Sequence, residues 1–124
     1  MKSTILFILI ACPSLPFAQQ KYVIKGKAGA LNAPAKIFLV YNAGNQRITD
    51  SSAVKNGVFE FAGQVDDITQ AILIMDYKGT GLQSFAPNSP YDSSPLFLEQ
   101  GTTTLSSTDS LVNATLSGTK ANND

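Results

Sequence analysis

The sequence of 124 residues contains no histidine and only one cysteine, Cys12. Without histidine, the chain lacks the side chain that most often acts as a general base or ligates a metal near neutral pH. A single cysteine cannot form an internal disulfide, a Cys-x-x-Cys redox pair or a thiolate zinc cluster. No serine lies in a Gly-x-Ser-x-Gly elbow, so the pattern of a serine hydrolase is missing too. We therefore expect no catalytic residue, no cofactor site and no metal site in this chain.

The chain also lacks an excess of either charge. Nine basic and nine acidic residues cancel, so neither a nucleic-acid partner nor an acidic disordered tail is indicated. Hydrophobic residues make up 44% of the sequence, which is enough for the core of one globular domain of this length.

The first residues resemble a targeting segment. Lys2 is followed by a purely apolar run over residues 5–11, which is too short to span a bilayer but fits the core of a signal peptide. We predict a helical signal peptide over residues 1–18, cleaved after Ala18, and a domain over residues 19–124 with no membrane span. Alternatively, residues 9–12 resemble a lipobox, in which case Cys12 is lipidated. Both interpretations place the protein outside the cytoplasm, in the periplasm or cell envelope.

Short strands separated by turn residues fill the remainder of the chain. Residues 22–27 alternate, whereas residues 35–41 and 71–77 are apolar on both faces, as in buried central strands. Further strands are predicted over residues 96–99 and 102–106, which could form a hairpin around Gln100-Gly101, and over residues 112–117. Residues 119–124 resemble a domain boundary. We predict an all-β domain, an antiparallel sandwich or barrel-like fold of about seven or eight strands.

The most informative local signal is Asn56-Gly57, which lies between residues 46–54 and 58–65. Both residues tolerate the positive φ of a type I′ turn, so the pattern predicts a hairpin in which Val54 pairs with Phe59. The apolar face of that hairpin would carry Ile48, Val54, Phe59, Phe61 and Val65. The polar face would carry Arg47, Thr49, Ser51, Lys55, Glu60 and Gln64.

The order and spacing of these segments resemble a known family. The stretch DSSAVKNGVFEFAGQV, the strands before it, and the later segments PLFLEQG and LVNATLSGT are similar to domain of unknown function 4369. That resemblance covers residues 22–124 and implies a β-rich domain found at the N-terminus of exported thioredoxin-like thiol–disulfide oxidoreductases of Bacteroidota. In such proteins a domain with a Cys-x-x-Cys pair follows, and this sequence contains no such pair. The resemblance therefore implies a non-catalytic domain whose partner is a thioredoxin-like domain or another envelope protein.

Carboxylates are the remaining candidates for chemistry, and each has a simpler interpretation. Asp50 falls on the apolar face of the predicted hairpin, where we expect it to accept hydrogen bonds from neighbouring backbone N–H groups. Asp66-Asp67 is interpreted as an acidic turn, because no dense carboxylate cluster for calcium surrounds it. Nothing in the sequence places Glu60 and Glu99 on opposite sides of a cleft, as a glycosidase would require.

The long segment over residues 78–94 is rich in Gly, Ser, Pro and Asn and is predicted to be irregular. Tyr77, Phe85 and Tyr91 lie in or beside it, and aromatic residues on a long loop can form a binding surface. They could equally fold back over one end of the domain. A stand-alone module that binds a peptide or glycan, through this loop or through an exposed sheet edge, is the alternative function.

The targeting segment gives the first prediction. We expect the protein recovered from an exporting bacterial host to begin at Gln19, because the junction after Ala18 follows the apolar run. Intact-mass measurement checks this. A mass that begins at a diacylated Cys12 would instead show a lipoprotein, and a full-length mass from the cytoplasm would contradict export.

Overall fold

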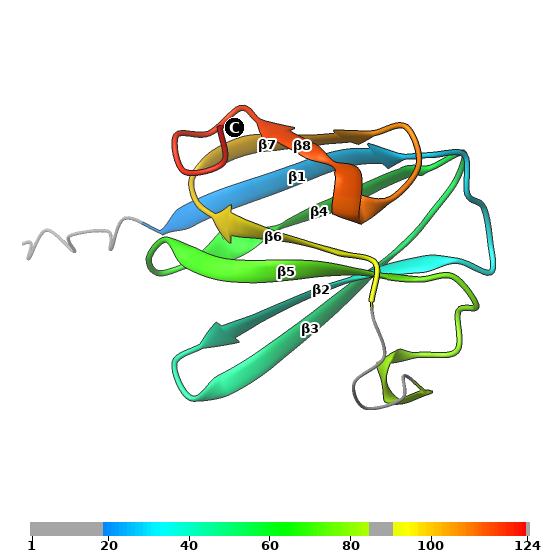
Figure 1. Ribbon diagram of the computed structural model, residues 1–124. Coiled ribbons are helices and arrows are strands. Elements are labelled where there is room, and N and C mark those ends of the chain that lie inside the picture. Colours follow the sequence, from blue (N-terminus) through cyan, green and yellow to red (C-terminus); the bar gives the residue numbers. More distant parts are fainter. Residues whose placement is uncertain (1–18, 85–90, 124) are drawn as a thin grey trace, which may run out of the picture.

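The computed structural model describes residues 19–84 and 91–123; the predicted signal peptide, Cys12 and Phe85 lie outside this part of the chain. The described residues form two facing sheets (Figure 1). Their strands are β1 (Gln20–Ala28), β2 (Lys36–Ala43), β3 (Gln46–Ala53), β4 (Val58–Val65), β5 (Thr69–Asp76), β6 (Ser93–Leu98), β7 (Gly101–Ser107) and β8 (Thr115–Ser117). Two short 3-10 turns, η1 (Leu82–Ser84) and η2 (Leu111–Asn113), complete the described elements.

Each sheet has four strands. The first sheet has the order β4-β1-β7-β8, and the second has the order β3-β2-β5-β6. The predicted β-sandwich is therefore confirmed, with one difference. β1 and β7 run parallel, whereas the expectation was an antiparallel fold. The chain changes sheets between β1 and β2, β3 and β4, β4 and β5, and β6 and β7.

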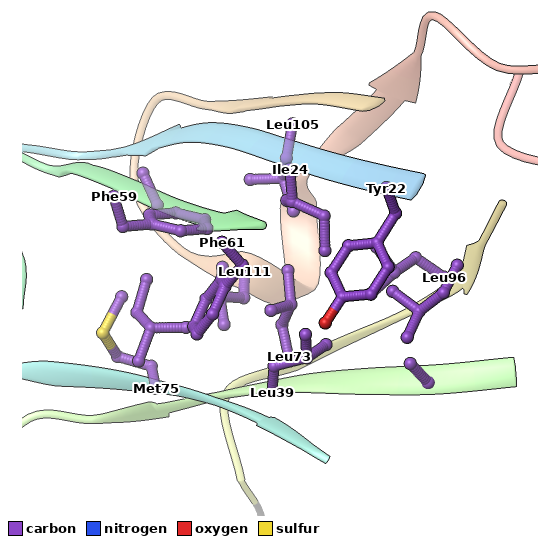
Figure 2. Close-up of a cluster of buried hydrophobic side chains, with 14 of the residues drawn as sticks. Tyr22, Ile24, Leu39, Phe59, Phe61, Leu73, Met75, Leu96, Leu105 and Leu111 are labelled. Carbon is purple, nitrogen blue, oxygen red and sulfur yellow. The ribbon is translucent and has the colours of Figure 1, made fainter. Parts of the chain in front are cut away.

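Alternation along the strands builds the core between the sheets. In β1, Tyr22 and Ile24 are buried, whereas Lys21 and Lys25 are exposed, because successive side chains of a strand point to opposite faces. Figure 2 shows Tyr22 and Ile24 directed toward residues of the second sheet, with η2 contributing to the same cluster. Members of this cluster include Tyr22, Ile24, Leu39, Phe59, Phe61, Leu73, Met75, Leu96, Leu105 and Leu111.

The predicted hairpin at Asn56-Gly57 has the right turn but the wrong partners. Asn56 and Gly57 have positive φ angles of 50° and 78°, and Lys55 and Val58 exchange both backbone hydrogen bonds, of 3.1 and 2.9 Å. Pairing ends there. β3 continues beside β2, and β4 pairs with β1 in the other sheet. The turn is thus a corner between the sheets, and Val54 does not pair with Phe59.

The same correction applies at Gln100-Gly101. β6 belongs to the second sheet and β7 to the first, so these strands do not form the predicted hairpin. A hairpin does form between β2 and β3, whose register pairs Ala43 with Gln46 around Gly44 at a φ of 61°.

The predicted apolar and polar faces of residues 46–65 agree with the observed burial, although the strand partners differ. Phe59 and Phe61 are each 3% exposed and Val54 and Val65 are buried, as predicted. Ile48 is only half-buried, because β3 lies at the edge of its sheet. Lys55, Glu60 and Gln64 are exposed, as expected for the polar face.

The C-terminal segment, which resembles a domain boundary in the sequence, packs against the domain. Thr119 and Asn122 are buried, and residues 119–123 lie beside β7 and β8 (Figure 1). Among the described residues, no helix has the length and apolar character needed to cross a membrane.

The packing of β4 gives the second prediction. Phe59 lies opposite Gly26 in the register, and a side chain at Gly26 would overlap the Phe59 ring. Replacing Phe59 with alanine should lower the free energy of unfolding by about 3–5 kcal/mol, through lost burial and the cavity that remains. Urea unfolding measures this change.

Val58 is the matched control, because it is the neighbouring residue in β4 and is 53% exposed. Val58→Ala should cost less than about 1 kcal/mol. Equal losses for the two variants would contradict the burial of Phe59.

Candidate functional site

Two of the aromatic residues suggested for a binding surface lie within the described residues. Tyr77 and Tyr91 are 47% and 42% exposed, and they flank the segment between β5 and β6. The phenol Oη of Tyr77 donates a hydrogen bond of 2.6 Å to Asp92 Oδ2. Partial burial and the bond to Asp92 raise the pKa of Tyr77 to about 12. One of the three aromatic residues proposed for binding is therefore fastened to the domain.

Asp92 joins three parts of the structure at this end of the sandwich. Its carboxylate accepts hydrogen bonds from Tyr77 and from the backbone N–H groups of Leu111, at 3.1 Å, and Val112, at 2.9 Å. Its backbone oxygen accepts a bond from Met75 N–H at 2.9 Å. The carboxylate satisfies the unpaired N–H groups at the start of η2, as a capping residue does. Asp92 therefore anchors the loop and is not free for chemistry.

Asp76, at the end of β5, has a similar role. Its side chain is buried and accepts hydrogen bonds from Gly79 N–H at 3.0 Å and Gly81 N–H at 2.8 Å. The backbone of this glycine-containing turn thus surrounds a carboxylate of the same chain. These donors therefore serve the fold.

A buried polar cluster connects the C-terminal segment to both sheets. Asn122 Oδ1 accepts a bond from Phe97 N–H at 2.8 Å, and Asn122 Nδ2 donates to Phe97 O at 2.7 Å. The same amide donates to Thr103 and Thr119, at 2.9 and 3.0 Å. Glu99 Oε1 accepts a bond from Ala121 N–H at 2.7 Å. This cluster closes the edge of β6 and ties the C-terminal segment to it.

The other carboxylates suggested by the sequence do not come together. Glu60 is exposed on β4, whereas Glu99 is buried. Asp50 accepts the N–H of Ser51 at 2.8 Å, as expected, and Asp67 accepts that of Ile68 at 2.8 Å. In the part of the chain that the structure describes, no group of three or more His, Cys, Asp or Glu residues could hold a metal ion.

The outer face of the second sheet is the most distinctive surface of the domain. Strand alternation and register place fourteen residues on it, beside the buried Asp76 at the end of β5: Lys36, Phe38, Val40, Asn42, Arg47, Thr49, Ser51, Ala53, Gln70, Ile72, Ile74, Ser93, Pro95 and Phe97. Seven of them are apolar, and the charged members are Lys36, at the start of β2, and Arg47, opposite Asn42 near the other end of that strand. By contrast, the outer face of the first sheet carries Lys21, Lys25, Lys27 and Glu60.

A hollow of about 670 Å³ lies on this outer face. Val40, Ile72 and Pro95 form its apolar floor, as neighbours in the register of β2, β5 and β6. Asn42, Gln70 and Arg47 add polar groups around the floor. We define the hollow by these six residues. Sites for small ligands and peptides commonly combine such a floor with a few polar groups.

Sequence reasoning placed Arg47 on a solvated hairpin face and did not single out Asn42 or Gln70. The available signal was the apolar character of residues 35–41 and 71–77 on both faces. It was interpreted only as burial. In a two-sheet domain, however, the second apolar face of a central strand points away from the core.

Comparison with known proteins gives one match. The family described as Domain of unknown function (DUF4369) matches residues 22–124. No curated protein and no solved structure matches the chain.

The contact between Tyr77 and Asp92 gives a pH-dependent prediction. The pKa of Tyr77 is raised from 10.0 to about 12 in the folded state, so the folded protein holds this proton more tightly than the unfolded chain does. The stabilisation is complete below pH 10 and should be lost as the pH rises to about 12. Phenolate absorbance of the wild type minus that of Tyr77→Phe isolates the titration.

In Asp92→Ala, the same titration should move toward lower pH, because both the acceptor and its negative charge are removed. A Tyr77 midpoint at the ordinary value in the wild type would contradict the contact.

Proposed function

The chain belongs to the family described as Domain of unknown function (DUF4369), and we propose that it is a non-catalytic interaction domain of an exported protein. In this proposal it works in the periplasm or cell envelope and positions a thioredoxin-like thiol–disulfide oxidoreductase domain. The association with a thioredoxin-like domain comes from the resemblance described under Sequence analysis.

The observation that carries the proposal is the outer face of the second sheet. An apolar area bordered by polar residues is typical of surfaces that pack against another protein. Pro95 and Phe97 are exposed there, and Phe38 and Ile72 are half-buried. The first sheet presents three lysines and a glutamate on its own outer face, which suits contact with water. The domain therefore offers one side to a neighbour.

The use of its polar groups also supports a non-catalytic role. Asp76, Asp92, Glu99 and Asn122 accept or donate hydrogen bonds that hold loops and the C-terminal segment in place. Thiol–disulfide exchange needs an attacking thiolate and a resolving partner, and the sequence has only Cys12.

A second candidate is a stand-alone module that binds a peptide or glycan. The hollow favours it, because its floor and polar groups could hold a ligand without any attached domain.

An insulin-reduction assay tests whether the chain itself lacks redox activity and whether an attached thioredoxin-like domain supplies it. The full chain alone should give no turnover above a Cys12→Ser variant, because it has no cysteine pair. The full chain joined ahead of a thioredoxin-like domain with a Cys-x-x-Cys pair should reduce insulin. Turnover by the chain alone would contradict the non-catalytic assignment.

Hydroxyl-radical footprinting of the same fusion tests the docking surface. Side chains on the outer face of the second sheet should become protected, and Phe97→Ser should weaken that protection. Val58→Ser is the matched control, because Val58 is an exposed apolar residue of the first sheet. Equal accessibility of the outer face with and without the attached domain would contradict the proposed docking.

A further inference from the structure

Arg47 is the unusual member of the hollow. It is exposed on β3, and no described residue gives its side chain a hydrogen bond or an ion pair. The nearest acidic residue in sequence, Asp50, points to the opposite face of β3, since it pairs with the core residue Leu39. Its carboxylate is bonded to Ser51 N–H. The guanidinium is therefore an available cation beside an apolar floor, which suits a ligand that carries one carboxylate.

The next acidic residues limit where that carboxylate can lie. Asp66 and Asp67 line a separate hollow, which shares Tyr41, Asn42 and Thr69 with the first. A ligand carboxylate is therefore attracted to the β3 side of the floor, at Arg47, and repelled from the side that adjoins Asp66 and Asp67.

Two amide side chains identify the kind of ligand. Asn42 and Gln70 both line the hollow and are exposed, and each amide offers donors and an acceptor. A peptide backbone can use both functions, whereas the alkyl chain of a lipid can use neither. The combination of amides, an apolar floor and one cation therefore favours a peptide.

The spacing of the floor sets the pattern of such a peptide. From Pro95 to the β3 strand there are three interstrand steps of about 4.8 Å each, or about 14 Å in total. In an extended chain, side chains at positions i, i+2 and i+4 share one face and span about 13 Å. Two aliphatic side chains on the floor can thus be followed by an acidic side chain at Arg47.

We propose that the hollow binds an extended peptide segment with branched aliphatic residues at alternate positions and a carboxylate that pairs with Arg47. This assignment rests on the interaction function proposed above, because it specifies what one part of the outer face holds. Peptide binding is measured on the chain alone, so its failure is distinguishable from failure to dock a thioredoxin-like domain.

The probe is the blocked peptide acetyl-Val-Ser-Val-Ser-Glu-amide, titrated into isotope-labelled full chain and followed by backbone amide resonances. Saturable shifts should centre on Val40, Asn42 and Ile72. The peptide with Gln in place of Glu should bind about tenfold more weakly, through loss of the charged pair. Acetyl-Val-Val-Ser-Ser-Glu-amide keeps the composition but divides the aliphatic side chains between two faces, so it should bind more weakly as well.

Variants of the protein locate the charge. Arg47→Gln should weaken binding of the probe by about tenfold and remove the preference for Glu over Gln. Lys25→Gln is the matched control, because it removes an exposed charge from the first sheet, and it should bind as the wild type does. Both substitutions are at exposed positions, and unchanged thermal unfolding verifies that the fold is intact.

Three results would overturn the assignment. The first is the absence of saturable shifts at the hollow with the Glu peptide. The second is equal affinity of the wild type and Arg47→Gln for that peptide. The third is saturable binding of decanoate where the peptide fails, which would make the hollow a site for an amphiphilic anion.

Discussion

The corner at Asn56-Gly57 is the constraint on which the two-sheet arrangement depends. Gly57 N–H donates to Leu31 O at 2.8 Å, and Gly57 O accepts from Ala28 N–H at 3.0 Å. Asn56 N–H donates to Asn32 Oδ1 at 2.9 Å. A Cβ at Gly57 would overlap the backbone oxygen of Gly29. Because the segment after β1 occupies the inside of the turn, the strands on either side cannot continue as a hairpin, and β4 enters the other sheet.

This placement of β4 determines how the core is filled. Gly26 and Gly63 lack side chains, and the strand beside each one supplies an aromatic ring in its place. Phe59 pairs with Gly26 and Tyr22 pairs with Gly63, and a Cβ at either glycine would overlap the facing ring. Tyr22 is only 4% exposed, and its burial and the neighbouring Tyr41 raise the pKa of its phenol. Cross-strand aromatic–glycine pairs of this kind also fix the register.

The sequence determined the faces of the strands but not their partners. Alternation around Phe59 and Phe61 identifies which side chains point inward whichever strand lies alongside, so their burial was predicted correctly. Pairing depends on contacts between distant segments, and the corner at Asn56-Gly57 depends on residues near Gly29 and Leu31. An Asn-Gly turn alone does not distinguish a hairpin from a corner. The predicted pairing of residues 46–54 with residues 58–65 was wrong because these distant contacts decide it.

The C-terminal segment illustrates the same limit. Asn122 is separated from Phe97 by 25 positions. Nothing near Asn122 in the sequence indicates that its side-chain amide will bond the N–H and C=O groups of Phe97, as a neighbouring strand would. Asp92 is similar, because its role as a cap for η2 depends on residues that follow it by 19 and 20 positions. Among the candidate binding residues, Arg47 could be placed on a polar face from the sequence. Its position beside an apolar floor follows only from the pairing of β3 with β2.

The backbone groups at the two edges of the second sheet, on β3 and β6, affect whether a partner can bind by adding a strand. On β6, Pro95 has no N–H, and both backbone groups of Phe97 are bonded to Asn122. On β3, Asp50 occupies Ser51 N–H and the Ser52 hydroxyl donates to Ala53 O at 2.9 Å. Natural sheets protect their edges by comparable means, which hinder the addition of another strand. An incoming segment therefore finds fewer free backbone groups at these edges than an open strand would offer. Recognition through side chains on the outer face fits this structure better than extension of the sheet.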